Sequence, residues 1–184
     1  DLFSIYLGIS RTSNTKDIVM TSDINNSKIS LNDFSEYGFC FACGPKNSSG
    51  LNLFFKHKGK GVETSFQFDS RFQGFPNYMH GGIISTILDE TMNRAALSQN
   101  YWVLTAQMEV KFKQPIILNE KIYAYGEIKR KIGKLLLIKS LIKLQNDSIA
   151  ATATGHFSII PEVKLKNMTK DYPQLANQWM NYPD

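Results

Sequence analysis

The spacing of apolar residues changes from a helical period to strict alternation between residues 80 and 112, and this change restricts the folds open to the chain. From His80 to about Ser98 the apolar residues recur with a helical period. One arc of roughly 140° on a helical wheel holds Ile83, Ile84, Ile87, Leu88, Thr91 and Ala95. Such an arc predicts a helix packed against a sheet. In LTAQMEVKF, residues 104–112, apolar and polar residues then alternate, as they do in a half-buried strand.

Further strands are predicted on both sides of this helix. Residues 51–68, LNLFFKHKGKGVETSFQF, indicate two short strands joined by a Gly-Lys-Gly turn. Three more candidate strands lie around residues 120–130, 134–145 and 148–160, with the tight-turn sequences RKIGKL and QNDS between them. A hairpin, one long helix and a meander predict an α+β architecture with an antiparallel sheet of about five to six strands.

The length of 184 residues suits one domain with tails. Residues 1–33 are rich in Ser, Asn, Thr and Asp without a sustained period, which predicts a loosely ordered arm. We expect the folded domain over residues 34–160. Residues 161–184 form a polar tail that could include a short helix packed on the outside.

Charge and hydropathy argue against two classes of partner. The formal net charge is +5, but the basic residues are scattered, and the one tight group, Lys129–Lys134, lies at a predicted turn. Such a pattern usually marks solvated surface, and it would serve a bulky anionic small molecule, such as a nucleotide-bearing thioester, equally well. We expect no nucleic acid. No run approaches the roughly 18 apolar residues of a membrane span, and the opening DLFSIYLGIS lacks the basic flank of a signal peptide. These features favour a cytoplasmic protein.

The two cysteines, Cys40 and Cys43, form a C-x-x-C in GFCFACGPKNSSG. Zinc needs about four ligands, and His57, His80 and His156 have no paired spacing. We therefore expect a structural turn with reduced thiols and no metal, with a metal or redox role as the alternative. Two cysteines fit a reducing compartment.

The predicted helix begins with a pair of glycines, Gly81 and Gly82, directly after His80. A helix N-terminus presents unpaired N–H groups and a partial positive charge. Glycine lets a ligand oxygen approach them, and an oxyanion that develops from a thioester carbonyl would be a suitable occupant. The alternative is that the glycines only permit a tight entry into the helix.

Asp89 lies eight residues after Gly81, about 12 Å along one helix. That distance is too long for both groups to contact one reacting carbon. If both act on one substrate, two chains must contribute, and antiparallel pairing of two such helices across a twofold axis would bring Gly81 of one toward Asp89 of the other. The spacing therefore predicts a dimer.

The surroundings of Asp89 on the wheel are unusual for a solvated carboxylate. Asp89 falls nearly opposite the apolar arc, but its flank carries no Lys or Arg; it holds Ser85, Met92, Asn93 and Ala96. We expect this flank to be a subunit seam or a pocket wall. Glu90 and Arg94 have the i,i+4 spacing of a structural ion pair.

Several of these segments resemble one family. HGGIISTILDETM resembles the helix signature of hotdog-fold acyl-CoA thioesterases of the PaaI-like group, in which an acidic residue follows the His by nine positions, as Asp89 follows His80. VLTAQMEVKFKQPI is similar to the strand that follows in that group. CFACGPKNSSGLNL and FQGFPNYMHGG are similar to a turn and a loop of one subset. The resemblance covers roughly residues 38–160.

The resemblance implies a hotdog fold, an antiparallel sheet wrapped around one central helix, and hydrolysis of an acyl-CoA thioester without cofactor or metal. Asp89 would be the nucleophile or general base, and Gly81 would donate its N–H to the thioester oxygen. His80 would shape the site or bind near the carbonyl, and Thr105 would position water or the carboxylate. The working unit would be a homodimer or a dimer of dimers.

The remaining expected substrate-binding residues are Gly82, Gln73, Asn77 and Asn93. Three of these positions depart from the family's sequence pattern. Many relatives carry Asn or Gln where this chain has Gly74, and Gln73 stands one position earlier. Asn77 replaces a common Gly, and Asn93 replaces a small residue. His57 and His156 are expected to be solvated and structural, respectively. Phe75, Met92 and Met108 are candidates for the acyl pocket. The alternative function is a non-catalytic hotdog domain that binds an acyl thioester.

Overall fold

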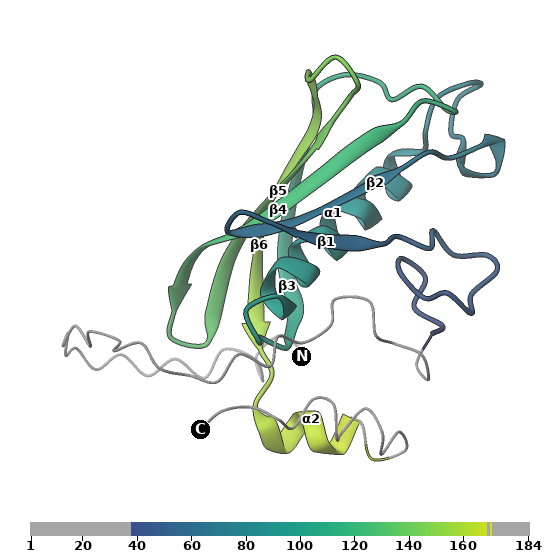
Figure 1. Cartoon of the computed structure of the whole chain (residues 1–184). Helices are drawn as coiled ribbons and strands as arrows, with labels where there is room; N and C mark the ends of the chain where they lie inside the picture. The colour runs from purple at the N-terminus through teal and green to yellow at the C-terminus, as the bar shows by residue number, and fades with distance from the viewer. Residues whose placement is uncertain (1–37, 169, 171–184) are drawn as a thin grey trace.

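The protein is described from a computed structural model, which places residues 38–168 and 170. A six-stranded antiparallel sheet curves around one long helix (Figure 1), in the strand order β1-β2-β4-β5-β6-β3. The elements are β1 (Phe55–Lys58), β2 (Gly61–Phe66), the 3₁₀ turn η1 (Ser70–Phe72), α1 (Gly81–Leu97), β3 (Val103–Phe112), β4 (Ile122–Ile132), β5 (Leu135–Lys143), β6 (Ile149–Ile159) and α2 (Glu162–Met168).

This arrangement confirms the predicted α+β architecture. The hairpin β1–β2 turns at Gly59, and the β4–β5 turn uses Gly133, both with the positive φ that glycine adopts without strain. Asp147 gives the third turn its positive φ between β5 and β6. The predicted arm, residues 1–33, lies outside the described residues, as does most of the predicted tail. No helix in the described part of the chain is long and apolar enough to cross a membrane.

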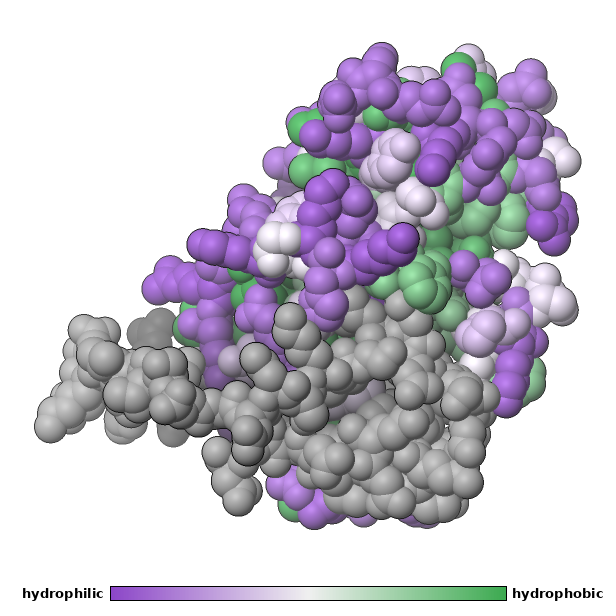
Figure 2. Space-filling view, in the orientation of Figure 1, coloured by the Kyte–Doolittle hydropathy of each residue, from purple (hydrophilic) through white to green (hydrophobic). Residues whose placement is uncertain are grey.

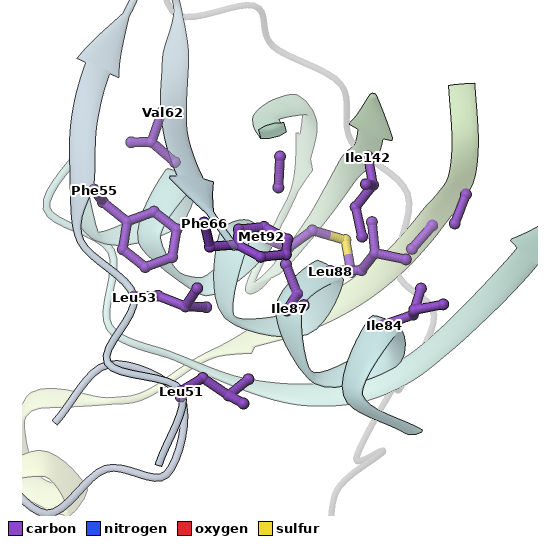
Figure 3. Packing of buried hydrophobic residues seen from close by; sticks show 14 of the residues in the cluster. Leu51, Leu53, Phe55, Val62, Phe66, Ile84, Ile87, Leu88, Met92 and Ile142 are labelled. Carbon is purple, nitrogen blue, oxygen red and sulfur yellow. The ribbon is translucent and has the colours of Figure 1, made fainter. Parts of the chain in front are cut away.

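The core lies between α1 and the concave face of the sheet. Figure 3 shows side chains of α1 meeting those of the β1–β2 hairpin and β5. The largest fully buried side chains include Ile87, Leu88, Met92, Phe55, Val62 and Ile142. Burying one such side chain stabilises the fold by about 1.5–3 kcal/mol. On the face shown in Figure 2, hydrophilic residues cover most of the described surface, as expected for a core enclosed on the other side of the sheet.

The sheet approaches α1 closely at Gly126 of β4. A Cβ at this position would lie 2.9 Å from both Cγ2 and the carbonyl oxygen of Thr91. Thr91 is fully buried, and its hydroxyl donates to the carbonyl oxygen of Ile87 at 2.6 Å. Glycine in β4 therefore lets the middle of α1 sit directly on the sheet and fixes how deep the helix lies.

Two parts of the predicted seam beside Asp89 are wrong. Met92 and Ala96 are completely buried in the core, whereas Ser85, Asp89 and Asn93 are half-buried. The sheet curves far enough around α1 to cover positions that the wheel placed near the open side. Met92 packs beneath β6, where a Cβ on Gly155 would meet it, so it belongs to the core rather than to an accessible acyl pocket.

Strand β3 departs from the predicted strict alternation. Its pairing with β6 shifts between Thr105 and Gln107, which leaves Ala106 as the extra residue of a β-bulge. Thr105 pairs with Phe157, a fully buried residue that faces the helix, and Gln107 pairs with the exposed His156. The bulge thus places Thr105 on the helix side of the sheet, although simple alternation would group it with Gln107 on the outer side.

Candidate active site

His80 terminates the loop before α1 and serves as the N-cap of the helix. Its backbone is extended, with φ −64° and ψ 135°, and its Nδ1 accepts a hydrogen bond of 2.9 Å from the N–H of Gly82. A donor at Gly82 is therefore already satisfied within the chain. The predicted start of the helix at the glycine pair is confirmed, but Gly82 has no N–H left for a ligand in this conformation.

Gly81 is the first residue of α1, and within the described residues its N–H has no hydrogen-bond partner. A Cβ on Gly81 would lie 3.7 Å from the ring of Phe112, at the end of β3. Gly81 borders a cavity of about 410 Å³ that is also lined by Gly74, Phe75, Tyr78, Met79 and His80. An unpaired N–H at a helix N-terminus beside a cavity of this size is a suitable place for an anionic or carbonyl oxygen.

The entrance to this cavity is rich in exposed aromatic and aliphatic surface. Phe75 is 81% exposed and Phe112 is 56% exposed, and Tyr78 and Ile117 are joined by a β-bridge nearby. Exposed apolar groups clustered beside polar ones mark binding or interaction surfaces. Phe112 was not predicted as a site residue. The one feature of the sequence that could have indicated it is its place as an aromatic residue at the end of an alternating strand.

Asp89 lies on the middle of α1, half-buried, with its carboxylate directed at β3. Oδ1 of Asp89 accepts a hydrogen bond of 2.8 Å from the hydroxyl of Thr105. Burial raises the pKa of Asp89, the Thr105 hydrogen bond opposes that rise, and the negative charge of Glu90 adds to it. A half-buried carboxylate with a raised pKa is a candidate for acid–base or nucleophilic chemistry.

The structure brings Asp89 and Thr105 together, but it keeps Asp89 away from Gly81. Asp89 does not line the cavity at the start of α1, and the eight helical residues between the two positions span about 12 Å. One chain therefore presents two separate half-sites: an open N–H beside a cavity, and a carboxylate held by a hydroxyl.

The other predicted substrate-binding residues divide between these two half-sites. Gln73 Oε1 accepts from the N–H of Asn77 at 3.4 Å, and Asn77 has a positive φ of 68° that turns the chain toward His80. Both belong to the loop before α1, where Gly74 packs against His80. Asn93 lies one turn beyond Asp89 and is half-buried. His57 and His156 are exposed and belong to neither half-site.

The other side of α1 carries a polar cluster that the sequence predicted only in part. Glu90 Oε1 accepts from Arg94 Nε at 2.7 Å, which confirms the predicted i,i+4 pair. Arg94 is 5% exposed, and its Nη2 also donates to Sγ of Cys43 at 2.6 Å. Glu90 is paired with Arg94, whereas the neighbouring Asp89 has no salt bridge among the described residues and is bonded only to the Thr105 hydroxyl.

Comparisons with known proteins agree with the fold. Residues 76–150 match the family model described as "Thioesterase superfamily". Over 106 residues the chain is 29% identical to the acyl-coenzyme A thioesterase THEM4 of Rattus norvegicus, covering 57% of this chain and 46% of that protein. The chain thus spans about half the length of the curated relative that it matches.

Solved structures of low sequence identity share the fold. A thioesterase superfamily protein, RHA08564, has a TM-score of 0.64 at 18% identity, covering 74% of this chain and 68% of its own. The E. coli PaaI protein has a TM-score of 0.56 at 15% identity, with coverages of 59% and 83%. A hypothetical thioesterase from Streptococcus pneumoniae, solved with coenzyme A, has a TM-score of 0.56 at 16% identity, with coverages of 59% and 86%.

Proposed function

We propose that the chain, whose residues 76–150 match the thioesterase-superfamily model and whose fold is the predicted hotdog fold, hydrolyses an acyl-CoA thioester to a free carboxylic acid and CoA. The observation that carries the proposal is the pair of half-sites on α1. Asp89 is a half-buried carboxylate bonded to Thr105, and Gly81 offers an unpaired N–H beside a cavity. Hydrolysis of a thioester requires a base or nucleophile of this kind, and it requires a hydrogen-bond donor that stabilises the developing oxyanion.

In the proposed reaction the thioester oxygen accepts a hydrogen bond from the N–H of Gly81. Asp89 either attacks the carbonyl carbon, expelling the CoA thiolate and forming an anhydride that water then cleaves, or removes a proton from the attacking water. Thr105 holds the carboxylate and favours its ionised form. Because Nδ1 of His80 accepts from Gly82, a neutral His80 ring carries its proton on Nε2 and offers it near the carbonyl.

We propose that the working unit is a homodimer or a dimer of dimers. Three observations support this proposal. Gly81 and Asp89 are too far apart in one chain to act on the same carbon. β3 is a ten-residue edge strand, a form that readily pairs with another chain. Phe112 at the end of that strand and Phe75 in the cavity next to Gly81 expose apolar rings. An antiparallel pair of chains would let each cavity face the carboxylate of the other chain.

The substrate contacts proposed beyond the reacting groups come from the loop before α1 and from the turn after Asp89. Gln73 and Asn77 would contact the thioester arm, and Asn93 would contact the acyl group near Asp89. Phe75 lines the cavity, and Met108 is half-buried against the core, so both remain candidates for the apolar lining. Both cysteines are reduced, which fits the cytoplasmic location that we propose.

A panel of acyl-CoA substrates of different chain length and type tests the proposal, with the released CoA separated by chromatography so that the chain's own thiols do not contribute. We expect release from at least one acyl group, and loss of nearly all turnover in Asp89→Asn with CoA binding retained. Glu109→Gln is the matched control, because Glu109 is an exposed carboxylate on β3. If no substrate releases CoA while calorimetry detects binding, the domain is a binding module.

A further inference from the structure

The flank of α1 opposite Thr105 holds a cluster that hydrolysis does not use. Sγ of Cys40, Sγ of Cys43 and a carboxylate oxygen of Glu90 all lie within 4.8 Å of one another. Arg94, nearly fully buried, donates to both Cys43 and Glu90. Two thiols, a carboxylate and a guanidinium are therefore gathered beneath the loop that precedes β1.

The loop around the cysteines is built to keep them close. The N–H of Gly44 donates to the carbonyl oxygen of Cys40 at 2.9 Å, and a Cβ on Gly44 would lie 2.5 Å from both the nitrogen of Cys40 and the carbonyl oxygen of Gly38. Only glycine fits there. The N–H groups of Leu51 and Leu53 donate to the carbonyl oxygens of residues 41 and 42, between the cysteines. The backbone of this loop therefore holds the two cysteines close together.

The two thiols have different surroundings. Cys40 is half-buried, and a hydrogen bond from the Cys43 thiol lowers the pKa of Cys40 to about 6. Cys43 is buried; its hydrogen bond to Cys40 and its burial raise its pKa. The hydrogen bond between the two sulfurs thus favours the thiolate on Cys40, the more accessible sulfur, and the neutral thiol on the buried Cys43. This asymmetry is what a reacting thiolate and a second, resolving thiol require.

A metal ion fits this cluster less well. The described residues offer three ligand atoms here, whereas zinc prefers about four. Arg94 is bonded to two of the three ligand residues, so a cation already compensates the charge that a metal would neutralise. The guanidinium also opposes the rise in the pKa of Cys43, but the hydrogen bond to Cys40 and burial act more strongly.

We propose that Cys40 and Cys43 form a reversible dithiol–disulfide pair that reacts with hydroperoxides. The Cys40 thiolate attacks the terminal peroxide oxygen, the O–O bond breaks, and the alkoxide or hydroxide that leaves takes up a proton. The Cys43 sulfur then attacks the resulting sulfenic sulfur, the S–O bond breaks, and water departs with the Cys43 proton. Two thiols and one hydroperoxide become one disulfide, one alcohol or water, and one further water; two electrons pass from sulfur to oxygen.

Intact-mass spectrometry of the full chain tests the reaction without any thioester, so its failure is distinct from failure of the proposed hydrolysis. The chain has only two cysteines. After treatment with hydrogen peroxide we expect the mass to fall by two hydrogens and both sites to resist a maleimide label, and a dithiol reductant to restore two labels. Cys40→Ser and Cys43→Ser should each lose the disulfide. Two labels remaining after a dose that oxidises free glutathione would overturn the proposal.

The role of each thiol is tested by the pH dependence of Cys40 alkylation. Wild type and Cys43→Ser, which keeps a hydroxyl donor, should react with a midpoint near pH 6. Cys43→Ala removes the donor, and the midpoint should rise toward about 8.5; circular dichroism checks that each variant is folded. Equal midpoints in Ser and Ala variants would contradict the assignment, as would one tightly held zinc per chain that is lost in Cys40→Ser.

Discussion

The hydroxyl of Thr105 donates a 2.8 Å hydrogen bond to Oδ1 of Asp89, and it thereby joins the edge strand β3 to the central helix. The contact depends on the bulge at Ala106, which turns Thr105 toward the helix. The hydrogen bond sets the direction of the Asp89 carboxylate. It also lowers the pKa of Asp89 and so opposes burial, which raises that pKa. The strand that would lie at the subunit edge therefore also tunes the proposed catalytic group.

Replacing Thr105 should shift the acid limb of the pH–rate profile. Thr105→Val keeps the side-chain shape but removes the donor, so the pKa of Asp89 should rise further. Since the ionised carboxylate is the active form in the proposed reaction, kcat/KM should begin to fall at a higher pH than in wild type. Thr105→Ser retains a hydroxyl and should keep the wild-type limb. A Val variant with an unmoved limb would show that Thr105 only packs against the helix.

Asp89→Asn should stabilise the fold at neutral pH while it abolishes turnover. Burial raises the folded-state pKa of Asp89 above the unfolded value, so the folded carboxyl binds its proton more tightly. The stability of wild type therefore falls as pH rises from the unfolded pKa, about 3.9, to the folded one, and stays lower above both. Scanning calorimetry should show a higher Tm for Asn at pH 7, with a difference that shrinks near pH 4. A lower Tm at both values would contradict the burial of charge.

Gly81→Pro should remove one hydrogen-bond donor with little effect on folding. Proline is favoured at the first residue of a helix, and the extended backbone of His80, with ψ 135°, suits the position before proline. Losing an oxyanion donor lowers kcat by about 10²–10³-fold. Gly81→Ala keeps the N–H and meets only an ordinary contact with Phe112, so it should retain most activity. Steady-state kinetics on both variants, with melting curves, check this.

Mixing two inactive variants should restore activity if each site uses two chains. A heterodimer of Gly81→Pro and Asp89→Asn has one site with both intact groups and one with neither. Random pairing at equal amounts should recover about a quarter of the wild-type rate, because half the dimers are mixed and each has one working site. The variants must be unfolded and refolded together. No recovery, with dimers verified by ultracentrifugation, would place Gly81 and Asp89 in independent sites.

Arg94→Leu should destabilise the fold strongly, although Arg94 lies outside the proposed reaction. The change leaves the mostly buried Glu90 without its ion-pair partner and removes a donor from Cys43. Breaking a buried pair from one side lowers the free energy of unfolding by about 3–5 kcal/mol. Urea titration measures this, and Arg71→Leu, which breaks an exposed pair with Asp69, should change little. If the two losses are equal, the buried cluster is not structural.

Much of the fold and part of the site follow from local sequence. The helix predicted from His80 to about Ser98 runs from Gly81 to Leu97, and the turns at Gly133 and Asp147 lie where they were expected. These features depend on neighbouring residues: side-chain period, an N-cap and residues that tolerate positive φ. The Glu90–Arg94 pair is of the same kind, because i,i+4 side chains meet on any helix.

Other features depend on residues far apart in the chain, and no local pattern carries them. The burial of Met92 follows from how far the sheet curves around α1, and the contact of Arg94 with Cys43 joins two segments 51 residues apart. The hydrogen bond that uses the N–H of Gly82 depends on the rotamer of His80. The sequence therefore predicted Gly82 as a substrate-binding residue, although its N–H already donates to His80.

By itself, the sequence determined the order of the elements, the glycine entry to the helix and the spacing of about 12 Å between Gly81 and Asp89, because helical rise depends only on residue count. The tertiary structure decided which groups meet. Strict alternation would have directed Thr105 away from Asp89, and only the mismatch in pairing between β3 and β6 inserts the bulge that reverses it. Strand register is a long-range property, since it is set by the partner strand as well as by the residues of the strand itself.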